Sequence, residues 1–255
     1  MVPPTHLPAP PAIADDWALF LDVDGTLLEF AATPEGVQVP PGLVARLAGL
    51  QRHLGGALGL VSGRRLAQLD ELFAPLRLPA AGLHGLERRH ADNHVDPPTP
   101  PSLLRVLHRK AELVVERFPG ALVEDKDSTV ALHWRGNHEA EQPLRDLADA
   151  ALPWLHDYRL QAGDGVVELR PAGTDKGDAI AALLDEPPFA GRRPVFVGDD
   201  LTDEHGFEVV IARGGLAVLV GDRTPTLASH RLGAPRDVLA WLDATADAPS
   251  HRSTA

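Results

Sequence analysis

WALFLDVDGTLLEF, residues 17–30, joins an apolar run to two closely spaced carboxylates. The first five residues are all apolar, which predicts a strand buried on both faces. Asp22 and Asp24 follow this strand at once, and Gly25 comes directly after them. Because ligands of open parallel sheets bind at the carboxyl ends of the strands, the stretch predicts a polar site at the end of a central strand.

Composition narrows the classes of protein to which the chain can belong. Its 255 residues suffice for one large domain or two smaller ones. The net charge of −12 argues against nucleic acid or an acidic membrane as the main partner. The sequence has no cysteine, which excludes disulfides, thiolate catalysis and zinc–thiolate sites. No apolar run approaches the ~20 residues of a membrane span, and the proline-rich N-terminus does not resemble a signal peptide, so we expect a cytoplasmic protein.

The order of predicted elements indicates a discontinuous domain with an insert. On both sides of the insert strands alternate with helices, as expected for a parallel sheet covered by helices. The core elements expected are a strand ending at Asp22, strands at 57–61, 194–200 and 215–220, and helices at 41–54, 64–73, from 176, from 202 and at 238–242. The insert repeats the order helix–strand–strand, with helices at 102–118 and 139–156 and strands at 121–126, 128–135, 158–162 and 165–170.

This order predicts an α/β fold that carries an additional α+β domain. We expect a core domain formed by residues 14–91 and 172–245, an inserted domain at 92–171, and flexible tails at 1–13 and 246–255. The proline-rich stretch at 91–101 is the expected linker into the insert.

Polar residues follow further strands of the predicted core. Ser62 and Gly63 come after the second strand, and Asp199 and Asp200 end the strand that begins near residue 194. Carboxylates delivered by separate strands suit a hard dication such as Mg²⁺. Either acidic pair alone is also compatible with a turn that caps the following segment, but two such pairs at strand ends favour one shared site. An EF-hand loop is excluded, because the glycine is only the fourth residue from Asp22 and a strand precedes the loop.

Four ordered motifs resemble those of the haloacid dehalogenase (HAD) phosphohydrolase superfamily. They are DVDGTL (22–27), SG (62–63), Lys176 and GDD (198–200). Further stretches resemble the trehalose-6-phosphate phosphatase family, namely SGR (62–64), GLHGLE (82–87), VEDKDSTVALHWR (123–135), ELRPAGTDKGDAI (168–180) and VFVGDDLTDEHGF (195–207). The long interval between the second and third motifs is where the superfamily carries its larger cap. The resemblance therefore implies a Rossmann-like HAD core with a parallel sheet and an inserted α+β type-two cap domain.

The resemblance also implies roles for the residues of the core site. Asp22 would be the nucleophile that forms an aspartyl-phosphate, and Asp24 the general acid and base. Ser62 would hydrogen-bond a phosphate oxygen, and Lys176 would neutralise the phosphate and the Asp22 carboxylate. The implied cofactor is Mg²⁺, bound by the Asp22 side chain, the Asp24 backbone carbonyl and the Asp199 side chain.

Residues beside these ligands receive supporting roles from the same resemblance. Asp200 and Asp203 would act through water or orient the metal ligands. Gly63 and Arg64, in SGR, would contact the substrate, and so would His84, in GLHGLE.

The strands of the insert present two different faces. Alternation places a set of ionisable side chains on one face, namely Glu124, Lys126, His133, Arg135, Glu168 and Arg170. The opposite face is apolar and includes Trp134, which stands where the family has tyrosine. The ionisable face is compatible with a solvated sheet surface, but its mixed donors and acceptors also suit a polyhydroxyl ligand. The resemblance implies sugar contacts for four of its residues, Glu124, Lys126, Arg135 and Glu168.

More than one function is compatible with these motifs. The leading hypothesis is a Mg²⁺-dependent phosphatase that hydrolyses the small molecule trehalose 6-phosphate and acts as a monomer. A related HAD sugar phosphatase acting on sucrose 6-phosphate or a mannosyl phosphate would share the core motifs, and only the cap motifs favour trehalose. A non-catalytic sugar-phosphate sensor would be expected if Asp22 or Asp24 were replaced, and neither residue is replaced.

Overall fold

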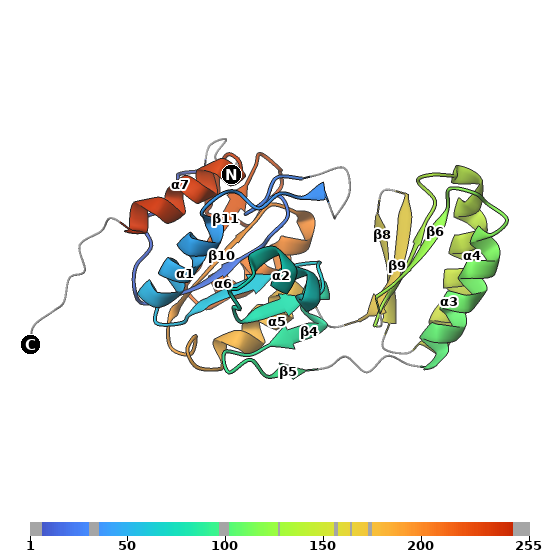
Figure 1. Cartoon of the computed structure of the whole chain (residues 1–255), viewed down its shortest axis with the longest axis horizontal. Coiled ribbons are helices and arrows are strands. Elements are labelled where there is room, and N and C mark those ends of the chain that lie inside the picture. Colours follow the sequence, from blue (N-terminus) through green and yellow to red (C-terminus); the bar gives the residue numbers. More distant parts are fainter. Residues whose placement is uncertain are drawn as a thin grey trace, which may run out of the picture. The chain divides into compact units, whose positions relative to one another are not determined.

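The structure is a computed structural model that describes residues 7–30, 36–96, 102–126, 128–155, 158–163, 165–172 and 175–246. These residues form two compact units (Figure 1). The first combines Met1–Asp96 with Asp175–Ala255, and the second is Pro97–Thr174. Each has its own hydrophobic core, and we call them the core unit and the cap unit. Among the helices of the described residues, none is long and apolar enough to cross a membrane.

The core unit is built on an eight-stranded sheet with the order β12-β11-β10-β1-β2-β3-β4-β5. Its strands are β1 (Trp17–Leu21), β2 (Leu58–Val61), β3 (Ala80–Gly82), β4 (Glu87–Arg89), β5 (Val95–Asp96), β10 (Arg193–Gly198), β11 (Leu216–Val220) and β12 (His230–Leu232). The strands from β12 to β3 run parallel, and β4 and β5 are antiparallel additions at one edge. Every residue of β1, β2 and β11 is buried, as their unbroken apolar sequences predict.

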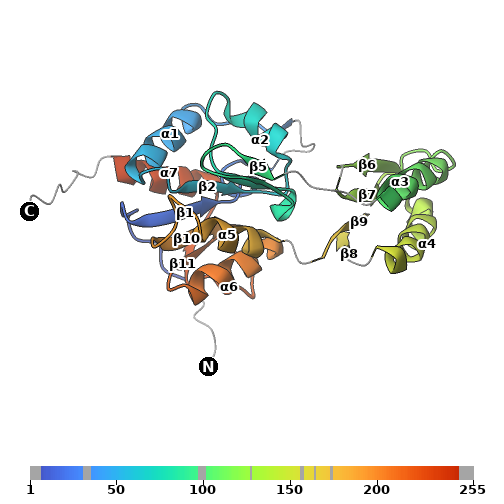
Figure 2. The same cartoon turned by 90° about the horizontal axis from the view of Figure 1, so that it is seen from below.

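Helices cover both faces of this sheet, as Figure 2 shows. On one side lie α1 (Leu43–His53), α2 (Leu66–Phe73) and α7 (Pro235–Ala246), and on the other α5 (Lys176–Leu184) and α6 (Glu204–Ala212). In α1, Leu43, Leu47 and Leu50 recur at helical spacing and are buried. The predicted α/β core is therefore confirmed.

The cap unit packs two helices on one face of a four-stranded antiparallel sheet. The sheet has the order β6-β7-β9-β8. Its elements are α3 (Ser102–Val115), β6 (Leu122–Asp125), β7 (Val130–His133), α4 (Glu141–Ala151), β8 (Tyr158–Gly163) and β9 (Val166–Pro171). Val130, Leu132 and Trp134 share its apolar core with residues of both helices, which confirms the predicted additional α+β unit. The guanidinium of Arg145 lies 4.6 Å from the centre of the Trp134 ring.

Some elements differ from the sequence-based prediction. The β4–β5 hairpin was not predicted, and β5 falls inside the expected linker at 91–101. The short edge strand β12 was also missed, because three residues carry too little alternation to indicate a strand. The single helix expected at 139–156 is three pieces, with 3₁₀ turns at His138–Ala140 and Leu152–Trp154 on either side of α4.

The described part of the N-terminal segment is attached to the core unit. Pro8 O accepts a hydrogen bond from Arg231 N at 2.9 Å, and Pro11 O accepts one from Trp241 Nε1 at 2.8 Å. Ile13 is buried in the core. These contacts replace the flexible tail expected at residues 7–13, and the first six residues lie outside the described part of the chain.

Candidate active site

Asp22, Lys176 and Asp203 form a buried ionic cluster at the carboxyl edge of the core sheet. Asp22 directly follows β1, and Lys176 is the first residue of α5. Lys176 Nζ donates to Asp22 Oδ1 at 2.7 Å and to Asp203 Oδ1 at 2.6 Å. The exposed fractions of the three residues are only 4, 3 and 0%, so water does not screen these bonds. The fold thus brings together motifs that lie far apart in the sequence.

Burial and mutual attraction shift the ionisation of this cluster in opposite ways. For Asp22, burial is the largest cause and raises the pKa well above its ordinary value, although Lys176 acts in the other direction. For Lys176, burial would lower the pKa, but the charges of Asp22 and Asp203 outweigh it and raise the pKa. Lys176 therefore stays charged, whereas the buried Asp22 carboxylate requires further positive charge to be fully ionised.

A carboxylate from the fourth motif lies beside this cluster. Asp199 follows β10, and its Oδ1 lies 3.4 Å from the hydroxyl of Thr26, which donates to it. Oxygen atoms of Asp22, Asp199 and Asp203 all lie within 4.8 Å of one another. Burial, with the nearby Asp203 charge, raises the pKa of Asp199 to about 6. Crowded hard oxygen donors of this kind fit a divalent cation such as Mg²⁺, because a dication relieves their repulsion.

Gly25 is required in the loop that follows β1, where the Asp199 side chain lies close to the backbone. Its φ is +82°, in the left-handed region that favours glycine. A Cβ atom at this position would also overlap the Asp199 carboxylate. The glycine in DVDGTL therefore serves both the turn and the close approach of the acidic residue from β10.

Asp203 also orders the loop that carries Asp199 and Asp200. Its Oδ2 accepts hydrogen bonds from the backbone N–H groups of both residues at 2.9 Å. Because its Oδ1 is bound to Lys176, Asp203 uses both oxygens inside the protein. Asp200 is exposed, and its side chain accepts a hydrogen bond from Leu201 N. This geometry gives Asp203 the contacts of an orienting residue and leaves Asp200 at the surface.

Asp24 is held by Arg64 through two hydrogen bonds. The guanidinium donates from Nε to Oδ2 at 2.7 Å and from Nη2 to Oδ1 at 2.6 Å. Ser62 is buried, and its Oγ accepts a hydrogen bond from Arg64 N at 3.1 Å. The guanidinium of Arg64 is thus joined to the Asp24 carboxylate, and its expected contact with substrate stays a prediction.

The loop that carries His84 is joined to the loop of the second motif. His84 N donates to Ser62 O at 2.9 Å, and Leu83 N donates to Arg64 O at 2.9 Å. The imidazole fills the space beside Gly63, where a Cβ atom would lie 2.7 Å from His84 Nε2. His84 itself has a φ of 56°, a strained conformation for a residue with a side chain. The structure therefore brings Ser62, Gly63 and His84 together.

Arg223 is a residue near the site that the sequence did not indicate. It follows β11, and its guanidinium donates to the backbone carbonyls of Asp199 at 3.4 Å and Asp200 at 3.3 Å. It also forms an ion pair with Glu204, the first residue of α6. Only the packing of β11 beside β10 brings Arg223 to the acidic loop, so no local motif could have identified it.

A second acidic cluster, on the core unit, has a structural explanation. Asp175, Asp178 and His205 lie close enough to hold a cation. However, Asp175 is the N-cap of α5 and accepts hydrogen bonds from Gly177 N and Asp178 N. His205 Nδ1 lies 2.5 Å from the second oxygen of Asp175. Helix capping therefore accounts for these residues.

In the cap unit, three of the expected sugar-binding residues lie together. Lys126 Nζ lies 3.3 Å from Glu168 Oε1 and 3.7 Å from Glu124 Oε2. Glu168 also accepts a hydrogen bond from the buried Thr129 hydroxyl at 2.9 Å. A hydrogen bond from His133, followed by the charge of Lys126, lowers the pKa of Glu124. These residues form a charged network on the sheet face opposite the helices.

The two arginines expected on this face are placed differently. Arg135 lies just beyond β7 and is exposed. Arg170 is only 2% exposed and donates from Nη1 to Gln161 Oε1 at 2.9 Å. Arg170 is therefore part of the packed sheet, in contrast to the open polar face expected from strand alternation.

Comparison with known proteins gives consistent matches over most of the chain. The family model described as trehalose-phosphatase matches residues 20–232. A "Probable trehalose-phosphate phosphatase" of Sinorhizobium fredii is 48% identical over 223 residues, which cover 86% of this chain and 83% of the relative. The "Trehalose-6-phosphate phosphatase" of Escherichia coli K12 is 42% identical over 235 residues, with coverages of 91% and 88%.

A solved structure with the same fold is the C-terminal domain of the Candida albicans trehalose-6-phosphate phosphatase. It has a TM-score of 0.72 and 21% identity, and the match covers 94% of this chain and 98% of that chain.

Proposed function

The chain belongs to the trehalose-phosphatase family and is a phosphoric monoester hydrolase, and from this premise we propose that it hydrolyses trehalose 6-phosphate with Asp22 as nucleophile and Mg²⁺ as cofactor. The observation that carries the proposal is the buried cluster of Asp22, Lys176 and Asp203 beside Asp199. We also propose a cytoplasmic location, as expected from the sequence.

The first step forms a bond between an Asp22 carboxylate oxygen and phosphorus. The bond between phosphorus and the sugar oxygen breaks at the same time, and trehalose leaves. Lys176 supports this step in two ways, because it orients the Asp22 carboxylate through Oδ1 and offers a positive charge to the phosphate oxygens. Ser62, buried at the end of β2, offers its hydroxyl to a phosphate oxygen.

Mg²⁺ would be held by the Asp22 side chain, the Asp24 backbone carbonyl and the Asp199 side chain. When bound, it would compensate the negative charges of the nucleophile and the phosphate. The raised pKa of Asp199 supports this choice of ligands, because a nearby dication favours the ionised carboxylate.

Asp24 would transfer protons in both steps. It gives a proton to the departing sugar oxygen, and it later takes one from the water that hydrolyses the aspartyl-phosphate. Arg64 donates one hydrogen bond to each oxygen of Asp24, and each oxygen keeps a second lone pair that can carry the transferred proton. We assign Arg64 the role of orienting Asp24.

The cap unit would recognise the sugar. Glu124, Lys126 and Glu168 present both acceptors and donors within one network, which matches the needs of hydroxyl groups. We include Arg135 among the proposed sugar contacts, because it is exposed beside this sheet.

Phosphate release from a panel of sugar phosphates tests the proposal. Trehalose 6-phosphate, sucrose 6-phosphate and glucose 6-phosphate would be compared with Mg²⁺ and with EDTA. We expect turnover of trehalose 6-phosphate above all, its loss with EDTA, and its recovery on adding Mg²⁺. A preference for another sugar phosphate would overturn the substrate assignment.

The matched variants are Asp22→Asn and Asp185→Asn. Asp22→Asn keeps the shape of the side chain but removes the nucleophile, so kcat should fall about 1000-fold or more. Asp185 forms a surface pair with Arg213 away from the cluster, so its variant should keep full activity. Substantial turnover by Asp22→Asn would contradict the role of Asp22.

A further inference from the structure

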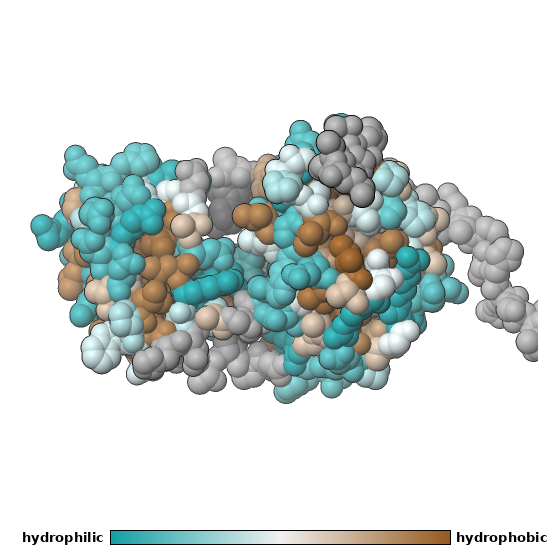
Figure 3. Space-filling view, turned by 180° about the vertical axis from the view of Figure 1, so that it is seen from behind, coloured by the Kyte–Doolittle hydropathy of each residue, from teal (hydrophilic) through white to brown (hydrophobic). Residues whose placement is uncertain are grey.

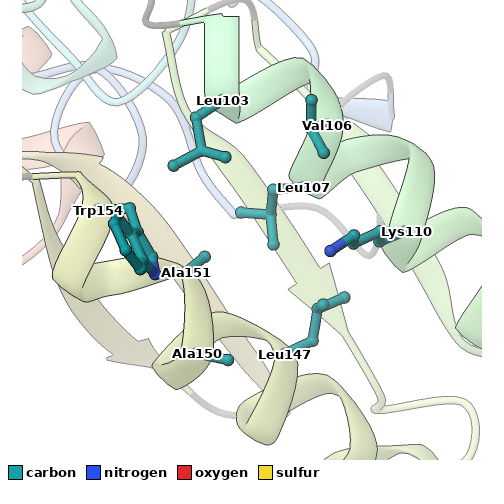
Figure 4. A pocket seen from close by; sticks show the side chains of 8 residues that line it. All are labelled: Leu103, Val106, Leu107, Lys110, Leu147, Ala150, Ala151 and Trp154. Atoms are coloured by element: carbon teal, nitrogen blue, oxygen red, sulfur yellow. The ribbon is translucent and has the colours of Figure 1, made fainter.

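A groove between α3 and α4 opens on the surface of the cap unit. Its lining residues, shown in Figure 4, are Leu103, Val106, Leu107, Lys110, Leu147, Ala150, Ala151 and Trp154. The volume of the groove is about 440 Å³. Trp154 is 74% exposed and Val106 47%, so large apolar side chains meet water here. Apolar surface also appears among hydrophilic residues on both units in the space-filling view of Figure 3.

The groove is separate from the proposed sugar-binding residues. The helices pack on the apolar face of the cap sheet, through residues such as Leu104 and Leu144. Glu124 and Glu168 lie on the other face of the same sheet. The proposed reaction therefore leaves this groove without a role, and an exposed apolar groove commonly marks a contact with another molecule.

The charges beside the groove have opposite signs on its two walls. Arg109 and Lys110 on α3 and Asp146 on α4 are exposed, and in the described part of the chain none of them forms an ion pair. Lys110 lies at the same end of the groove as Leu147, which directly follows Asp146 (Figure 4). The basic side chains of α3 and the acidic side chain of α4 therefore lie at the same position along the length of the groove.

We propose that this groove is the contact surface of a symmetric dimer of the chain. A two-fold axis parallel to the two helices would place α3 of one copy over α4 of the other. Lys110 would then face Asp146 of the partner, and the relation would repeat on the other side of the axis. A partner with a single sign of charge would be repelled by one of the two walls, so a second copy fits best.

The size of the surface predicts a weak dimer. Stable interfaces use roughly 20–30 residues on each side, whereas the groove and its charged walls offer about half that number. Leu113, which is 62% exposed on α3, extends the apolar stripe by two turns beyond Val106. We therefore expect a dissociation constant on the order of micromolar. The proposed dimer differs from the monomer expected from the sequence, and the experiments below decide between the two.

Sedimentation velocity of the full chain over about 1–300 μM tests the dimer, at ~0.15 M salt to screen the net negative charge. The mass should rise with concentration from 27.3 kDa toward twice that value. Val106→Glu would bury a charge in the contact and should raise the dissociation constant about 10-fold or more. The control Ile211→Glu adds the same charge at a 42% exposed position on α6 and should leave the constant unchanged.

Charge reversal tests the proposed symmetry directly. Lys110→Glu and Asp146→Lys should each weaken the dimer about 3- to 10-fold, because like charges would face each other. The double variant restores opposite charges across the axis and should recover most of the affinity. A chain that stays monomeric throughout the range would overturn the proposal, and so would a double variant weaker than both single variants. Circular dichroism would confirm that each variant is folded.

Discussion

Arg64 binds both carboxylate oxygens of Asp24, with Nε at 2.7 Å from Oδ2 and Nη2 at 2.6 Å from Oδ1. Paired, charge-assisted hydrogen bonds of this kind fix the plane of a carboxylate as well as its position. The side chain of Arg64 is only 10% exposed, so the pair is partly shielded from solvent. The orientation of the proposed general acid therefore depends on the residue that directly follows the second motif.

Arg64→Ala should weaken protonation of the leaving group. We expect kcat/KM for alkyl and sugar phosphates to fall about 10- to 100-fold, because Asp24 loses its orientation. Phenyl phosphates with increasingly acidic leaving groups should lose progressively less, because they need less help from an acid. The measurement is the slope of log kcat/KM against leaving-group pKa, which should become steeper in the variant.

Two outcomes would contradict the orienting role of Arg64. An equal loss across the whole phenyl phosphate series would indicate a contact with the phosphate, and an unchanged series would indicate a contact with the sugar alone. Arg64→Lys should recover only part of the activity, because an ammonium cannot reproduce the two parallel hydrogen bonds.

Lys176→Met should destabilise the protein as well as inactivate it. Removing the cation leaves Asp22 and Asp203 buried without their partner, which typically costs about 3–5 kcal/mol. The free energy of unfolding in urea, measured without metal, gives the effect. The control is Arg213→Met, which breaks a solvent-exposed pair with Asp185 and should cost less than about 1 kcal/mol. Similar losses in the two variants would contradict the importance of the buried cluster.

Mg²⁺ should stabilise the protein more at pH 7.5 than at pH 5. The pKa of Asp199 is raised from 3.8 to about 6, first by burial and then by Asp203. In the metal-free protein, the protonated Asp199 side chain therefore contributes fully to stability below about pH 4. This contribution is lost as the pH rises through about 6. A proton competes with Mg²⁺ below this pKa, so the apparent affinity should fall up to about tenfold per pH unit.

The shift of Tm on adding Mg²⁺, measured at both pH values, tests this prediction. Asp199→Asn is the matched control, because it removes this titrating carboxylate and should leave a smaller shift that depends less on pH. An equal Tm shift at pH 5 and pH 7.5 in the unmodified chain would contradict a metal site that includes Asp199.

Glu124→Ala and Glu168→Gln should reduce the hydrolysis of trehalose 6-phosphate selectively. Loss of a buried hydrogen-bond partner costs about 1–3 kcal/mol, which corresponds to roughly 5- to 150-fold in kcat/KM. p-Nitrophenyl phosphate has no sugar, so its hydrolysis should change little. Exposed Glu139 offers a control substitution to Ala in the same unit. Parallel losses on both substrates would mean that these residues support the fold, and the sugar-binding role would be dropped.

Several features could be predicted from the sequence because their signals are local. The unbroken apolar runs of β1 and β11 indicate strands buried on both faces. The acidic pairs that follow β1 and β10 lie at carboxyl ends of parallel strands, so their convergence follows from topology alone. The β4–β5 hairpin could not be read in this way, because short edge strands depend on the neighbour they pair with.

The sequence by itself determined the alternation of elements, the additional α+β unit and the motif residues that meet at the sheet edge, because period and order are properties of the chain. Only the tertiary structure decided that Arg64 is joined to Asp24, that Arg223 reaches the Asp199 carbonyl, and that α3 and α4 leave a groove between walls of opposite charge. Each of these relations joins segments that are distant in sequence. Their contact depends on how whole elements pack, and no single stretch of residues encodes that packing.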